Sequence, residues 1–103
     1  MQNAADYFVV MVDLGKIGRE AIVDPEMTWT GTLDAVRTAS GDGHPICFVH
    51  HIHDGVCEDR TQEALDIILN QIADYGDPLT YEQRDWVEHH FGFEVANSFR
   101  WAA

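Results

Sequence analysis

The run Tyr7–Val12 constrains the fold more than any other segment of this 103-residue chain. Its residues, Tyr-Phe-Val-Val-Met-Val, are aromatic, β-branched or otherwise apolar, which is typical of a β-strand. Because apolar residues occupy both faces of the run, it predicts a strand in the middle of a sheet with both faces covered. A chain of this length is expected to build one core, so we predict a single compact domain over residues 1–103.

Further strands and helices are indicated by residue spacing. Glu20–Asp24 predicts a second strand that Pro25 would end, and Ile46–His53 predicts a third. Apolar residues recur at three- and four-residue spacing in three other segments, and predict helices over about 28–40, 59–75 and 80–91. The tail over 93–101, which includes Trp101, fits a strand and a helix equally well.

Capping residues support the helix boundaries. Thr28 can cap the first helix, and Gly41 can close it. Two pairs stand at capping-box spacing at the starts of the second and third helices, Asp59 with Gln62 and Thr80 with Gln83.

The element order ββαβαα, followed by the tail, predicts an α+β fold. It is expected to be a small two-layer sandwich, with a three-stranded, mainly antiparallel sheet and helices on one face. A hairpin pairs the first two strands, and the helix after them returns the chain so that the third strand pairs with the first. The resulting sheet order, 2-1-3, puts Tyr7–Val12 in the centre.

The net charge of the chain excludes some classes of binding function. Eighteen Asp and Glu against six Lys and Arg give a formal net charge of −12. This balance argues against direct binding to nucleic acid or to an anionic membrane, because cationic side chains hold both. The chain begins with neither a basic segment nor a long apolar one, so we expect a cytoplasmic protein with Cys47 and Cys57 as free thiols.

Acidic residues concentrate in the second half of the chain. Eleven lie between Asp54 and Glu94, opposed only by Arg60 and Arg84. On the predicted helices they fall away from the apolar stripe, where they would form one anionic surface. Such a surface can serve solubility alone, or it can steer the protein toward a basic partner. The predicted partner-binding residues are Asp59, Glu63, Asp66, Asp74, Glu82, Asp85 and Glu88.

A cluster of histidines forms a second candidate functional site. In a strand, residues two apart share a face, so His51 and His53 should project together. With Asp54 they could hold Zn²⁺ or another transition metal. No HExxH or paired CxxC motif accompanies them, so partly buried, hydrogen-bonded histidines are the alternative interpretation. Further candidate ligands are His89, His90 and Cys57.

Three functions follow from these patterns. The first is a small acidic module that occupies a basic surface of a partner protein, such as an inhibitor or regulator of the phage or mobile-element type that imitates nucleic-acid charge, anti-CRISPR-like. The alternative is a histidine-dependent metal-binding protein or hydrolase centred on His51, His53 and Asp54. The third is an assembly subunit whose acidic face is only solvated. No cofactor and no catalytic residue is predicted, since nucleophile and phosphate motifs are absent from the sequence, and a non-enzyme is favoured.

Overall fold

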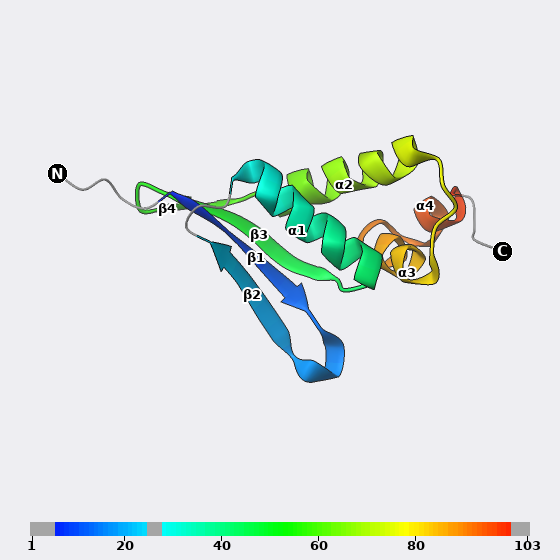
Figure 1. The fold of residues 1–103 in the computed structure, drawn as a ribbon, viewed down its shortest axis with the longest axis horizontal. Helices are drawn as coiled ribbons and strands as arrows, with labels where there is room; N and C mark the ends of the chain where they lie inside the picture. The colour runs from blue at the N-terminus through cyan, green and yellow to red at the C-terminus, as the bar shows by residue number, and fades with distance from the viewer. Residues whose placement is uncertain (1–5, 25–27, 100–103) are drawn as a thin grey trace.

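The computed structural model describes residues 6–24 and 28–99 (Figure 1). The strands are β1 (Tyr7–Asp13), β2 (Arg19–Asp24), β3 (Ile46–His53) and β4 (Val56–Asp59). The α-helices of the described ranges are α1 (Trp29–Asp42), α2 (Thr61–Tyr75), α3 (Tyr81–Phe91) and α4 (Phe93–Asn97). A short 3₁₀ turn, Gly15–Ile17, joins β1 to β2.

The strands form one antiparallel sheet in the order β2-β1-β3-β4. The α+β class, the interior position of β1 and the order 2-1-3 are therefore confirmed. The sheet has four strands, however, and the predicted three-stranded sheet is wrong. Figure 1 shows α1 lying over the sheet, α3 and α4 beyond one end, and the β1–β2 hairpin extending away from the helices.

A tight hairpin supplies the additional strand. Asp54 and Gly55 have φ angles of 50° and 75°, and two-residue type I′ turns need positive φ at both positions. The chain therefore folds straight back, and β4 pairs with β3 so that Glu58 lies opposite His51. No strand is predicted for this short segment from the sequence, because it lacks an apolar run of its own.

Among the described residues, the core covers β1 on one face only. Val10 and Val12 are 0% and 4% exposed and belong to the core. The alternate side chains, Tyr7, Val9 and Met11, are partly exposed and lie outside the core. The prediction that both faces are covered is wrong, because α1 packs on β1 and α2 packs on β3 from the same side.

The core fills the space between this face of the sheet and the helices. Val36 of α1, Ile68 of α2 and Trp86 of α3 are each fully buried. α3 packs against α1 and α4, so it extends the core beyond the end of the sheet. The buried apolar residues form one cluster: Val10, Val12, Val36, Ala39, Ile46, Val49, Ala64, Leu65, Ile68, Ile72, Leu79, Trp86, Val87 and Ala96.

Two of the predicted helix starts are confirmed by their caps. The Thr28 hydroxyl accepts a hydrogen bond from the backbone N–H of Gly31, 3.2 Å away. Thr80 and Gln83 form the complete capping box. Each cap satisfies backbone donors that the first helical turn leaves without a partner.

Two other predicted boundaries are wrong. Asp59 is the last residue of β4, and its carboxylate accepts from the backbone N–H and the hydroxyl of Thr61, where α2 begins. No capping box with Gln62 can form from that position. α1 continues past Gly41 to Gly43, whose left-handed φ of 74° ends the helix.

The first part of the tail is helical. Phe93–Asn97 forms α4, so the helix, and not the strand, is the correct one of the two predictions for this segment. Phe99 packs against the core. Pro25 and Trp101 lie outside the described residues. Within the described ranges, every helix is too short or too polar to cross a lipid bilayer.

The one-sided burial of β1 predicts opposite outcomes for two substitutions. Val10→Asp puts a carboxylate into the core without a partner, so we expect it to abolish cooperative unfolding. Val23 is 50% exposed on neighbouring β2, and Val23→Asp should cost no more than about 1 kcal/mol. Urea denaturation followed by circular dichroism measures both. A cooperatively folded Val10→Asp protein would contradict the position of β1.

Candidate functional site

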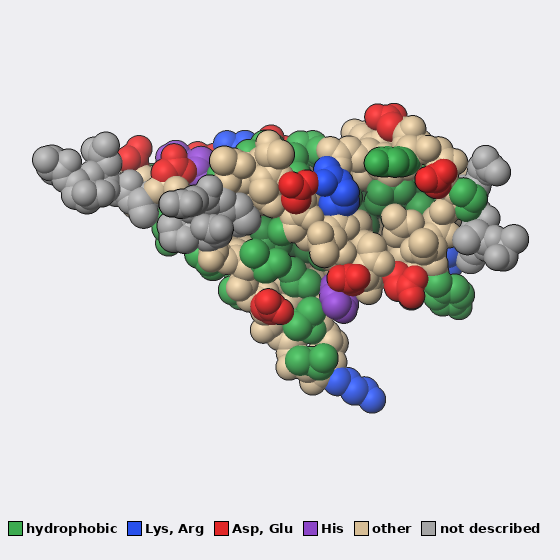
Figure 2. All heavy atoms as spheres, viewed as in Figure 1, with side chains coloured by type: hydrophobic (Ala, Val, Ile, Leu, Met, Phe, Trp, Pro, Cys, Tyr) green, Lys and Arg blue, Asp and Glu red, His purple; other side chains and the backbone are tan. Residues whose placement is uncertain are grey.

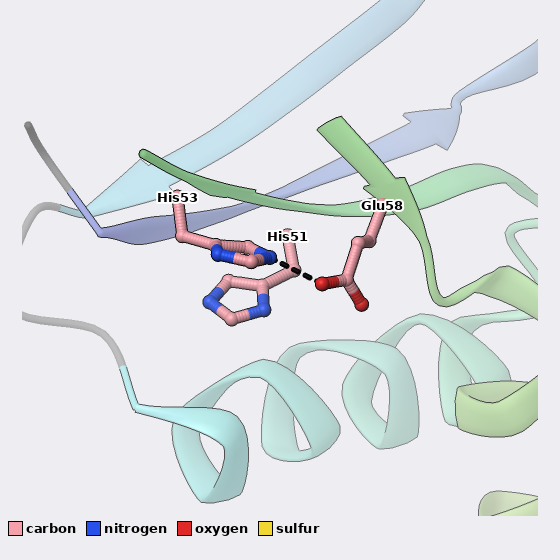
Figure 3. Close-up of side chains that lie close together, drawn as sticks. All are labelled: His51, His53 and Glu58. Carbon is pink, nitrogen blue, oxygen red and sulfur yellow. Dashed lines mark hydrogen bonds and ion pairs between the residues drawn. The ribbon is translucent and has the colours of Figure 1, made fainter. Parts of the chain in front are cut away.

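The β3–β4 hairpin brings two histidines and a carboxylate together. His51 and His53 are two residues apart on β3, and Glu58 of β4 lies directly opposite His51, so all three project from the same face. Figure 3 shows their side chains pointing toward one another, between the strands and α1. One ligand atom from each lies within 4.8 Å of the other two. We call these three residues the His–Glu cluster.

Glu58 is held by neighbouring cationic and hydrogen-bonding groups. Its Oε1 is hydrogen-bonded to Nε2 of His53, and its Oε2 lies 3.2 Å from a guanidinium nitrogen of Arg60. The hydrogen bond to His53 lowers the pKa of Glu58 below its ordinary value, and the charges of His53 and Arg60 act in the same direction. Glu58 is therefore an ionised carboxylate at neutral pH.

His51 is the most buried member of the cluster, with a side chain 17% exposed. Its Nε2 lies 2.6 Å from Oδ1 of Asp6. The ring stacks on Phe8 at a centroid distance of 4.3 Å, and the His53 ring lies 4.6 Å away on a tilted plane. Nδ1 is buried and has no hydrogen-bond partner among the described residues.

Asp54, the predicted third ligand, lies at the edge of this arrangement. Its side chain is 84% exposed in the hairpin turn, and its Oδ2 is 4.0 Å from Nδ1 of His53, beyond hydrogen-bond distance. Sequence reasoning missed Glu58, although a signal for it exists. Asp-Gly between two strand-like segments is a strong hairpin signal, and pairing the chain around it places Glu58 opposite His51.

The other candidate ligands lie elsewhere. Cys57 is exposed and, one residue before Glu58, projects from the opposite face of β4. His90 of α3 accepts a hydrogen bond at Nε2 from the backbone N–H of Ile46, 3.0 Å away. The neighbouring His89 ring contacts His90 edge to face. In the described part of the chain, none of the three joins the His–Glu cluster.

The predicted acidic residues fall on three elements. Asp59 lies on β4, on the face opposite the His–Glu cluster. The other six lie on helices: Glu63, Asp66 and Asp74 on α2, and Glu82, Asp85 and Glu88 on α3. On the face drawn in Figure 2, acidic side chains stand at separate points with apolar and polar atoms between them.

Two of these carboxylates have cationic neighbours. Glu63 lies 2.7 Å from Arg60, and Glu88 lies 3.1 Å from Arg84. The remaining four helical carboxylates are exposed and form no ion pair with a described residue: Asp66, Asp74, Glu82 and Asp85.

The second face of the sheet carries mainly apolar side chains, with His50 and Asp59 paired among them on β3 and β4. Its side chains form rows across the strands, with Val9 between Val23 and His50, and Met11 between Ala21 and Phe48. These apolar side chains do not belong to the core or pack against it, and Val23 is half exposed. We call this surface the open sheet face, and define it by Tyr7, Val9, Met11, Ala21, Val23, Phe48, Ile52 and Cys57.

Comparison of the chain with models of protein families, with curated proteins and with solved structures finds no match in any of the three.

The position of His90 predicts acid sensitivity. Burial lowers the pKa of His90 to about 4, and the nearby His89 adds to the shift. In the unfolded chain His90 is protonated below about pH 6.5, whereas in the folded chain it is protonated only below about pH 4. The free energy of unfolding therefore decreases as the pH falls from 6.5 to 4. Between pH 7 and pH 5 the loss should be about 2 kcal/mol.

Two variants isolate this effect. His90→Gln keeps a hydrogen-bond acceptor that does not titrate, and should remove most of the loss between the two pH values. The matched control is His89→Gln on the exposed side of the same helix, which should keep most of the loss because burial, and not His89, is the larger cause of the shift. Free energies of unfolding from urea titrations measure the difference. Equal acid sensitivity in wild type and His90→Gln would contradict the assignment.

Proposed function

We propose that this protein is a binding module for a partner protein with a basic surface, and that the open sheet face makes the contact. The observation that carries the proposal is a set of partly exposed apolar side chains on adjacent strands, which do not pack against the core. Contiguous apolar patches on soluble proteins commonly mark interaction sites. A sheet face is also rigid, because its side chains stand on paired strands, so little conformational entropy is lost on binding.

Net charge favours a basic partner over a second copy of this chain. Two copies would each carry −12, and their repulsion opposes close approach. A basic protein is attracted by the same field. Asp66, Asp74 and Asp85 form no ion pair with a described residue, and they contribute to that field because they are exposed.

The exposed carboxylates and the open sheet face contribute to different steps of binding. Exposed carboxylates act over several ångströms before contact, and salt screens them beyond about 10 Å at 0.1 M. Apolar contact forms only after docking, so it governs dissociation more than association. Carboxylates therefore need not lie within the interface to accelerate binding.

A nucleic-acid-binding protein is one source of a basic partner surface. A chain of net charge −12 that covers such a surface would compete with nucleic acid for it. An inhibitor or regulator of the phage or mobile-element type, anti-CRISPR-like, belongs within this proposal. The support for this narrower class is charge alone.

Neutralising the unpaired carboxylates should slow association. The variant carries Asp66→Asn, Asp74→Asn and Asp85→Asn, none of which loses an ion pair to a described residue. Partner proteins are captured from host lysate at low salt, identified and purified, and association rates are measured over a range of ionic strength. We expect about tenfold slower association at low salt and little difference at high salt. An unchanged association rate would leave solubility as the role of these carboxylates.

Changing the open sheet face should instead accelerate dissociation. Val9 and Val23 face each other on β1 and β2, and Val→Thr at both positions preserves shape and strand propensity. Loss of apolar contact should raise the dissociation rate about tenfold or more, with association nearly unchanged. Circular dichroism and thermal unfolding confirm the fold. If the double variant dissociates at the wild-type rate, the partner contacts another surface and the proposal is wrong.

A further inference from the structure

We propose that His51, His53 and Glu58 form a binding site for a divalent first-row transition-metal ion, with Zn²⁺ as the principal candidate. The site lies on the helix-facing side of the β3–β4 hairpin and shares no residue with the open sheet face. The proposal is therefore independent of the protein-binding function. It replaces the set of His51, His53 and Asp54 that the sequence alone suggested.

The chemistry of the donors selects the class of metal. Two imidazole nitrogens and one carboxylate oxygen suit Zn²⁺, Fe²⁺ and neighbouring ions. Ca²⁺ and Mg²⁺ prefer oxygen ligands and are poorly matched to a pair of histidines. Because Glu58 is ionised at neutral pH, it supplies the negative charge that two neutral imidazoles lack.

Asp6 orients His51 in the way that metal-binding histidines need. In Figure 3 one ring nitrogen of His51 faces Glu58 and the other points away from it. Nε2 is the nitrogen bonded to Asp6, so the nitrogen facing Glu58 is Nδ1, which is buried and has no partner among the described residues. A carboxylate that accepts from one ring nitrogen leaves the lone pair of the other available to a metal.

Backbone register and stacking hold the ligands close to a coordinating arrangement. His51 is fixed between Phe8 and His53, and Phe8 in turn contacts the Trp29 ring at a centroid distance of 5.5 Å. Ligands of tetrahedral zinc are about 3.4 Å apart, given metal–ligand distances of about 2.1 Å. The ligand atoms lie within 4.8 Å of one another, so coordination would require the hydrogen-bonded His53 and Glu58 to move apart and His51 to approach them.

Exposure indicates where a further ligand would enter. The His53 and Glu58 side chains are 30% and 40% exposed, whereas His51 is largely covered. Three protein ligands leave one position of a tetrahedral ion open, on the side that solvent reaches. Sites of this kind bind water or substrate at the open position, so the hydrolase alternative would use this cluster.

Zinc binding by the purified protein tests the site. The full chain is prepared without a histidine tag, freed of metal with a chelator and titrated calorimetrically with Zn²⁺ in an excess of Mg²⁺. The Mg²⁺ occupies non-specific sites on this acidic protein. We expect one equivalent of Zn²⁺ to bind and to raise the temperature of thermal unfolding.

Matched variants separate this site from other histidines and carboxylates. Glu58→Gln and His51→Asn should each lower zinc affinity by at least about tenfold and abolish the thermal shift. His50→Asn, on the opposite face of the same strand, and Asp54→Asn should bind as wild type does. If either site variant fails to fold without metal, His53→Asn is measured in its place.

Three results would overturn the proposal. The first is no saturable zinc binding in excess Mg²⁺, and the second is equal zinc affinity in wild type and Glu58→Gln. The third is a loss of affinity in His50→Asn as large as that in His51→Asn. Each would leave the His53–Glu58 and His51–Asp6 contacts as ion pairs that stabilise the hairpin.

Discussion

Every second side chain of β1 and β3 packs against α1 and α2. The positions of the His–Glu cluster and of the open sheet face both depend on this packing. Val10 and Val49 are directly paired across the strands, and both are fully buried. Because side chains alternate between faces, a shift of one residue would expose these valines and bury the opposite set. The same register places Phe8 against His51, so the pairing that buries the core also positions the histidines.

The helix-facing side of the sheet changes character along its length. Around Val10 and Val49 it is apolar and sealed by the helices. Two residues further along β3 it becomes polar, at His51, and solvent reaches the rim. Ionisable groups are tolerated there because each has a partner: His51 contacts Asp6, and His53 contacts Glu58. The His–Glu cluster occupies this boundary between core and solvent.

Arg60 and Arg84 pair with carboxylates that are close in sequence. Arg60 lies between Glu58 and Glu63, Arg84 contacts Glu88, and each pair joins groups close in sequence. Much of the net charge of −12 therefore remains uncompensated, as at the exposed Asp66 and Asp74. Surface ion pairs of this kind contribute little to stability, whereas the residual field acts over distances that matter for association.

The open sheet face is a consequence of how few elements the chain has. With α3 and α4 packed mainly beyond the end of the sheet, α1 and α2 make the main helix contacts with the strands, and they do so from one side. Apolar residues such as Val9 and Met11 cannot then be covered by the described chain. Burial on both faces, which the composition of the strand suggests, would need a further layer or a partner.

Features that depend on residues close together in the chain could be predicted from the sequence alone. The strand at Tyr7–Val12, the helix caps at Thr28 and Thr80, the α+β class and the order of the first three strands follow from side-chain pattern and backbone donors, which act over a few residues. Tertiary structure decided what pairs across a distance. The Asp54-Gly55 turn is a local signal, but the register that pairs Glu58 with His51 appears only in the folded hairpin, and the placement of the helices left one sheet face open. Hydrophobic periodicity predicts neither the pairing of β4 with β3 nor the open sheet face. It indicates which side chains share a face of a strand or helix, but not which other element packs against that face.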